Sequence, residues 1–130
     1  MESVWKYVLT LLGAVVLSGT AHAQTFTCAV SNNIPYCQYT GKLDRVYINI
    51  DKWMLFYFEQ SVDIALPASA GFTGISRGDA GAFAVSADPE FAEYFYSTAL
   101  TAFAGEKTVT IQMRGNVGGY MKVDRIWVTR

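Results

Sequence analysis

A helix with both ends marked, followed at once by a strand, is the feature that most constrains the fold of this chain. The helix is expected to run from Pro89 to about Ala104. Asp88 can accept hydrogen bonds from the free N–H groups of the first turn, and Pro89 suits the first helical position because its missing N–H costs nothing there. Gly105 favours termination. Apolar side chains recur at helical spacing and predict one buried stripe: Phe91, Phe95, Ala99, Ala102 and Phe103.

Two strands are expected after the helix. Residues 107–113 alternate, which points Val109, Ile111 and Met113 inward and Thr108, Thr110 and Gln112 outward. The last strand occupies residues 120–129, and its apolar residues change phase in the middle. A bulge near Asp124-Arg125 would put all of them on one face: Met121, Val123, Ile126 and Val128.

Three strands are expected before the helix. Residues 43–50 alternate, with Leu43, Val46, Ile48 and Ile50 forming the apolar face. A tight turn at Asp51-Lys52 leads into the aromatic strand 53–58, and 82–86 is a third short strand. Residues 24–42 read as irregular, residues 61–66 as a short strand or an extended edge, and residues 67–81 as a long glycine-rich loop.

The resulting order of elements is three strands, a helix and two strands. That order is typical of a β-rich α+β domain of the OB type, a small five-stranded Greek-key barrel with one helix between strands 3 and 4. In such a barrel Phe91, Phe95 and Phe103 would plug one end. A β-sandwich with a stray helix is the alternative fold.

The N-terminus reads as a secretory signal peptide over residues 1–23. Lys6 precedes an apolar run from Val8 to Leu17, and Ala21-His22-Ala23 is a small-x-small cleavage pattern. The apolar run is too short to span a bilayer, which disfavours the alternative of a retained anchor. Residues 24–130 are then a single domain in an exported, secreted or periplasmic protein without a membrane span after cleavage.

Cys28 and Cys37 are expected to form a disulfide. They lie nine positions apart in a chain predicted to reach an oxidising compartment. A redox-active pair is the weaker alternative, because the spacing is not C-x-x-C.

Little catalytic chemistry is left in the exported chain. The one histidine, His22, lies in the predicted signal peptide, so neither Ser-His nor Cys-His activation nor a histidine metal site is available. We therefore predict no enzyme, no metal and no cofactor. A hydrolase using carboxylates alone is a third hypothesis, although the acidic residues are scattered. The near-neutral net charge of −1 does not suggest nucleic acid as a partner.

Binding is the better supported class of function, because seven tyrosines of residues 24–130 each offer an apolar ring and a hydroxyl. The tips of the disulfide loop and of the glycine-rich loop are the expected places for a ligand, since binding residues are concentrated in loops. The candidate ligand-binding residues there are Asn32, Asn33, Tyr36, Arg77 and Asp79.

The segment "YFYSTALTAFAGEKTVTIQ", residues 94–112, resembles the helix-to-strand segment of B subunits of the subtilase-cytotoxin and typhoid-toxin type. The likeness covers about a fifth of the chain. It implies an OB barrel that assembles as a homopentamer, binds sialylated glycans and delivers a separate catalytic A subunit. The chain departs from that family in the number and positions of its cysteines. The receptor-binding serine of the family lies in a segment that does not align, so no sugar-binding residue is transferred.

These observations predict an exported non-catalytic binding module that resembles AB5 toxin B subunits and recognises host or surface glycans. The alternative is a monomeric periplasmic envelope protein that binds a protein or a small ligand and has no toxin role.

Overall fold

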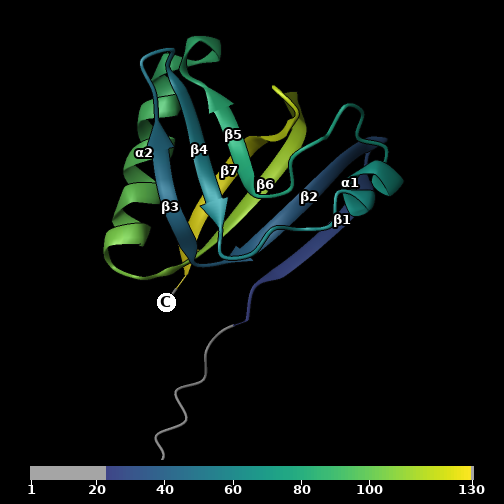
Figure 1. Cartoon of the computed structure of the whole chain (residues 1–130), viewed down its shortest axis with the longest axis horizontal. Coiled ribbons are helices and arrows are strands. Elements are labelled where there is room, and N and C mark those ends of the chain that lie inside the picture. The colour runs from purple at the N-terminus through teal and green to yellow at the C-terminus, as the bar shows by residue number, and fades with distance from the viewer. Residues whose placement is uncertain (1–22, 130) are drawn as a thin grey trace, which may run out of the picture.

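Seven strands and two α-helices make up the part of the chain that the computed structural model describes, residues 23–129 (Figure 1). The predicted signal peptide falls outside the described residues, apart from Ala23. In chain order the elements are β1 (Thr25–Ser31), β2 (Ile34–Gly41), β3 (Leu43–Ile48), β4 (Trp53–Phe58), α1 (Ala65–Ala70), β5 (Ala80–Ala84), the 3₁₀ turn η1 (Val85–Ala87), α2 (Pro89–Ala104), β6 (Thr108–Val117) and β7 (Tyr120–Thr129).

The predicted five-stranded OB-like barrel is wrong. The strands form one mixed sheet in the order β1-β2-β6-β7-β5-β4-β3, and its two ends, β1 and β3, are not paired with each other. β5 and β7 run parallel, whereas all other neighbours are antiparallel. Five strands precede α2 instead of three, so the helix does not fall between strands 3 and 4, and a barrel end for it to plug does not exist.

The segment predicted to be irregular, residues 24–42, supplies the two additional strands. β1 and β2 form a hairpin whose two-residue turn is Asn32-Asn33, with φ of 51° and 62°. Asparagine tolerates this left-handed conformation, which matches the twist of the adjoining strands. The strands were missed because threonine, glutamine and tyrosine occupy many positions where an apolar alternation would show.

The helix α2 has the predicted bounds. Asp88 Oδ1 accepts a hydrogen bond from the N–H of Phe91 at 3.0 Å, and Gly105 is the C-cap. Most of the predicted stripe is buried, but Phe103 is 41% exposed and does not belong to the core. The helix packs along one face of the curved sheet, where it contacts β3, β6 and β7.

Aromatic rings fill the space between α2 and the sheet. The ring centroid of Phe95 lies 5.6 Å from that of Phe56 on β4 and 6.2 Å from that of Phe83 on β5. The predicted inward residues of β6, Val109, Ile111 and Met113, are fully buried in the same cluster. This layer is the main hydrophobic core.

The predicted bulge in the last strand is confirmed. Gln112 pairs with Arg125 but Met113 pairs with Val123, so Asp124 is the extra residue on β7. Met121 and Val123 are buried and Ile126 packs against the core. Val128, however, is 39% exposed, because it lies near the end of the strand.

Three further expectations need correction. β3 ends at Ile48, and the apolar face predicted for residues 43–50 is only partly buried: Ile48 is 50% exposed and Ile50, in the following turn, is 95% exposed. Residues 61–66 do not form a strand; the short helix α1 begins at Ala65 and runs into the segment predicted to be loop. Thr110 points away from α2 as predicted but is buried, and its hydroxyl lies 3.0 Å from that of Thr40.

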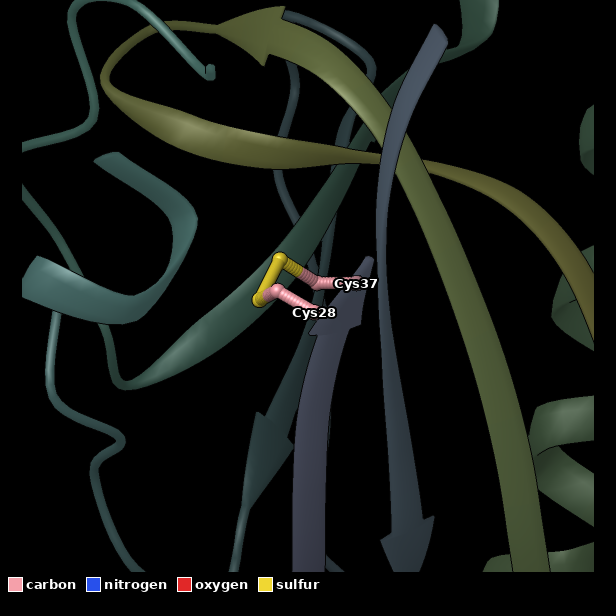
Figure 2. The surroundings of a disulfide bond; sticks show 2 residues. All are labelled: Cys28 and Cys37. Carbon is pink, nitrogen blue, oxygen red and sulfur yellow. A yellow bond between two sulfur atoms is a disulfide. The ribbon is translucent and has the colours of Figure 1, made fainter. Parts of the chain in front are cut away.

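The predicted disulfide is present between Cys28 and Cys37 (Figure 2). The two residues are directly opposite each other on β1 and β2. Cys37 is fully buried in the main core, so the bridge fastens the edge hairpin to the core of the domain.

We predict that the double variant Cys28→Ala/Cys37→Ala loses about 2–3 kcal/mol of unfolding free energy, since the unfolded chain is no longer cross-linked. Urea denaturation followed by circular dichroism measures this loss. A reducing agent should destabilise the native chain to the same extent and leave the variant unchanged. Equal unfolding midpoints for native chain and variant would contradict the prediction.

Tyr39 provides a second test of the core. It stacks on Phe58 with 4.2 Å between centroids, its hydroxyl donates to the carbonyl of Lys42, and it accepts from the N–H of Glu59 at 3.3 Å. Burial raises the pKa of Tyr39 to about 12, above its ordinary value of 10.0. The folded protein therefore keeps this proton at a pH where the unfolded chain loses it.

The raised pKa of Tyr39 contributes fully to the free energy of unfolding below pH 10, and this contribution is lost as the pH rises through 12. The expected loss is about 2–3 kcal/mol. Tyr39→Phe should weaken this alkaline decline and cost about 1 kcal/mol at neutral pH, because two backbone groups lose their partner. Denaturation at a series of pH values measures both effects. Tyr94→Phe, at an exposed tyrosine, is the control that should retain the decline.

Candidate functional site

The three predicted site residues of the β1–β2 hairpin have different environments. Asn32 and Asn33 are exposed and form the turn itself, so their backbone conformation accounts for the residue type. Tyr36 is half-buried on β2, and the guanidinium carbon of Arg114 lies 5.7 Å from the centroid of its ring. Tyr36 is thus the residue of this group with a side chain placed for binding.

Arg77 and Asp79 lie in the segment between α1 and β5. The Nε of Arg77 donates to the hydroxyl of Tyr120 at 3.1 Å, and its backbone N–H donates to the carbonyl of Gly119 at 3.1 Å. The backbone carbonyl of Asp79 accepts from Phe58 N at 3.0 Å, which extends the pairing of β4 with β5. Within residues 23–129, no hydrogen bond joins Arg77 or Asp79 to the predicted residues of the hairpin.

Arg77 is one end of a row of side chains that crosses four strands on the sheet face opposite α2. Arg45 on β3 is paired with Tyr57 on β4, and Tyr57 is paired with Ala80 on β5. Because Gly81 pairs with Met121 in the parallel β5–β7 register, Tyr120 is the neighbour of Ala80 on β7. We call Arg45, Tyr57, Tyr120 and Arg77 the arginine–tyrosine row.

An arginine guanidinium lies against the ring of each tyrosine in the row. The guanidinium carbon of Arg45 lies 4.0 Å from the centroid of the Tyr57 ring, and that of Arg77 lies 5.5 Å from the centroid of the Tyr120 ring. These distances are in the range of cation–π attraction. The two pairs hold positive charge against aromatic surface on both sides of the small side chain of Ala80.

Protonation in the row follows from these neighbours. The hydrogen bond to Tyr120 raises the pKa of Arg77, and the carboxylate of Asp79 raises it further. Burial raises the pKa of Tyr57, and the adjacent phenol of Tyr120 adds to that effect. The phenol of Tyr57 therefore stays protonated at neutral pH, and it can donate as well as accept hydrogen bonds.

Asp79 adds an unsatisfied acceptor beside the row. Its Oδ1 is buried and has no hydrogen-bond partner among the described residues. Buried polar atoms are usually paired, so this acceptor is an exception among the described residues.

A small second core supports the row from below. Its buried residues are Ala80, Ala82, Leu55 and Tyr120, of which the two alanines have no exposed surface. Tyr120 thus belongs both to the row and to this core. The half-buried Val117 packs against them. The turn between β6 and β7 closes this cluster, since the backbone of Gly118 lies directly against the indole ring of Trp53. The short side chains of β5 therefore let the β6–β7 turn fold over the sheet and bring Tyr120 beside Tyr57.

The pair of Tyr36 and Arg114 belongs to the same face. Cys37 and Met113, the neighbours of these residues, pair with each other in the main core, so alternation turns Tyr36 and Arg114 away from α2. This face carries three arginine–tyrosine pairs on β2, β3, β4, β6, β7 and the segment before β5.

Sequence reasoning named Arg77 of the row, together with Tyr36 and Asp79, but did not name Arg45. Tyr57 and Tyr120 were counted among many tyrosines and not singled out. The residues of the row are separated by long stretches of chain, and only the strand order brings them together. The turn predicted at Asp51-Lys52 would set Arg45 opposite Phe58. The hairpin of the structure is shifted by one residue and pairs Arg45 with Tyr57, so the sequence did not indicate this contact.

A hollow of about 610 Å³ lies at the C-terminal end of α2 and is a second candidate site. Two lysines and three carboxylates surround it, so its charges nearly balance, and it opens widely to solvent. Its charged lining residues are Lys42, Asp44, Glu59, Glu106 and Lys107. It has no aromatic ring paired with a charged group and is the less defined of the two sites.

Comparisons with protein-family models, with characterised proteins and with solved structures give no match for this chain. In residues 23–129, no helix has the length and apolar character to cross a membrane. The same residues contain no group of three or more histidine, cysteine, aspartate or glutamate side chains arranged to hold a metal ion.

The contact between Gly118 and Trp53 can be tested with a matched pair of variants. Gly118→Ala should cost about 2–3 kcal/mol of unfolding free energy, since a Cβ would lie 2.8 Å from the indole and φ is +60°. Gly115→Ala, at φ of +80° with no atom within 4 Å, should cost about 1 kcal/mol from backbone strain alone. Thermal unfolding followed by tryptophan fluorescence measures the difference; equal losses would mean that the indole does not pack on this turn.

Proposed function

We propose that this chain is an exported, non-catalytic binding module that recognises glycans through the arginine–tyrosine row. The observation that carries the proposal is the placement of Arg45 over Tyr57 and of Arg77 beside Tyr120 across adjacent strands. The half-buried Tyr57 offers apolar ring surface to the C–H face of a sugar, and its hydroxyl can form a hydrogen bond with a sugar hydroxyl.

The two arginines favour a sugar that carries an acidic group. A guanidinium presents several N–H donors in a planar fork, which fits a carboxylate or a sulfate with two parallel hydrogen bonds. Arg77 uses Nε for Tyr120 and is exposed to solvent, so its terminal nitrogens are directed to neither Tyr120 nor the backbone. Glycans ending in a sialic acid or another acidic sugar are therefore the preferred class of ligand.

The resemblance of residues 94–112 to toxin B subunits supports the same class of ligand, and a role in delivering a separate catalytic subunit remains part of the proposal. The barrel that this resemblance implied is not the fold of the chain. The glycan proposal accordingly rests on the row, with no residue transferred from the family.

The hollow at the C-terminal end of α2 favours a second candidate function. A periplasmic envelope protein that binds a small ligand would need a cavity of this size, and the mixed charges of Lys42, Glu59 and Lys107 suit a zwitterionic molecule. In that case ligand binding would respond to variants at the hollow and not to variants in the row.

A glycan array with the purified exported chain tests the main proposal. We expect binding to glycans with acidic termini, and Arg77→Ala should weaken it about tenfold or more, as expected for loss of a charge-assisted hydrogen bond. Tyr120→Phe should weaken it less, because the ring is retained and only the hydroxyl that orients Arg77 is lost.

Lys107→Ala is the matched control, since it also removes one positive charge but lies at the hollow. It should leave glycan binding unchanged. Absence of binding to any glycan at millimolar concentration, or an equal effect of Lys107→Ala and Arg77→Ala, would refute the proposal. Loss of small-ligand binding in Lys107→Ala alone would support the second candidate.

A further inference from the structure

A second group of basic side chains lies on the same sheet face as the arginine–tyrosine row. Lys122 is two residues from Tyr120 on β7, and it pairs with Ala82 of β5. Its neighbours Met121 and Val123 are buried in the main core, so alternation points the exposed Lys122 away from α2. Two residues along a strand span about 7 Å, which places Lys122 next to the row.

Arg125 on β7 and Arg114 on β6 extend this group. Arg125 pairs with Gln112, which alternates with core residues of β6, so Arg125 also belongs to the open face. The Nε of Arg125 lies 3.2 Å from Oδ2 of Asp124, and the Nε of Arg114 lies 3.7 Å from the same oxygen. The pairing of residues 121 and 123 with residues 116 and 113 of β6 sets Lys122 opposite Arg114 and its neighbour. We call Arg114, Lys122 and Arg125 the basic cluster.

The basic cluster has more positive charge than its surroundings balance. Asp124 is the one carboxylate shared by Arg114 and Arg125, and within residues 23–129 Lys122 forms no ion pair. One carboxylate cannot neutralise three cations, and like charges side by side repel each other. A second anionic group among them would reduce this repulsion. The two guanidinium groups already accommodate the carboxylate of Asp124, so a carboxylate is a group that fits there.

Charge is distributed unevenly over the two sides of the sheet. On one side, α2 and its N-cap contain no basic residue and three carboxylates, those of Asp88, Glu90 and Glu93. On the other side, the row and the basic cluster together supply the cationic side chains Arg45, Arg77, Arg114, Lys122 and Arg125, with Asp44, Asp79 and Asp124 beside them. The field of the molecule therefore attracts an anion to the open face and repels it from the helix.

We infer that the basic cluster is a second anionic subsite, and that the ligand is an oligosaccharide with carboxylates on neighbouring sugars, as in a chain of uronic acids. One carboxylate is bound by Arg77 at the row, and the next is bound by the basic cluster. This inference rests on the proposed glycan function and adds to it the number of acidic groups that the ligand carries. A single acidic terminal sugar would occupy the row alone.

Titration calorimetry with two ligands of equal length tests the second subsite. Tetragalacturonic acid, with four free carboxylates, is compared with tetramers that keep one free carboxylate and have three methyl esters. The native exported chain should bind the fully acidic tetramer at least about tenfold more tightly, as expected for additional charge-assisted hydrogen bonds.

The double variant Lys122→Gln/Arg125→Gln should reduce this ratio to about fourfold or less, the advantage that four copies of one group give by chance. It should leave the affinity for the mono-acidic tetramer unchanged, because that ligand uses the row alone. Arg77→Gln should weaken both ligands. Lys107→Gln, at the hollow beside the end of α2, is the matched control and should affect neither. Circular dichroism shows that each variant is folded.

The outcomes separate this inference from the proposed function. Equal affinity of the native chain for both tetramers, or an unchanged ratio in the double variant, would overturn the inference and leave binding of a single acidic sugar at the row intact. Displacement of the acidic tetramer by an equal concentration of an oligothymidylate would also overturn it, because the face would then attract any polyanion. If neither tetramer binds, the inference is overturned, and the proposed function falls with it only if the acidic glycans of the array also fail to bind.

Discussion

The packing of the aromatic layer between α2 and the sheet is the interaction on which the rest of the structure depends. Phe95 lies between Phe56 of β4 and Phe83 of β5, while Phe91 contacts Phe83 and Phe95 edge-on. Burying these rings removes a large apolar area from water, which is the dominant favourable term in folding. A sheet with one open face would be marginal without the helix that covers it.

The side of the sheet occupied by α2 determines where a ligand can bind. The main core and α2 cover one face of the sheet. The polar and aromatic side chains that alternate with the core residues therefore point to the other face. There the three arginine–tyrosine pairs lie in or beside the strands that build the core. Rigid strands hold such side chains more precisely than loop tips do, which is why the row is a better defined candidate than the exposed turn of the β1–β2 hairpin.

The open sheet also has two edge strands, which a closed barrel would not have. A closed barrel has no edges, whereas this sheet ends in β1 and β3. The disulfide and α1 stabilise the end at β1. The end at β3 keeps Tyr47 and Ile48 exposed, and Val30 is exposed on β1.

Features that depend on residues close together in the chain could be predicted from the sequence. The bounds of α2 follow from Asp88, Pro89 and Gly105, which act on the first and last turns by themselves. The bulge at Asp124 follows from the phase of the apolar residues in one strand, and the disulfide follows from two cysteines nine positions apart in a chain predicted to be exported. Each of these depends on groups only a few residues apart.

Strand order was not determined by the sequence, because any strand with one apolar face can pair with several others at similar local cost. The tertiary structure decided that β5 lies between β4 and β7, and this parallel contact brings Tyr120 beside Tyr57 and Arg77 beside Tyr120. The sequence by itself thus determined one capped helix, a bridged pair of cysteines and a set of strands. The candidate site exists only through long-range pairing, since the residues that compose it are remote from one another along the chain and no local pattern records their contact.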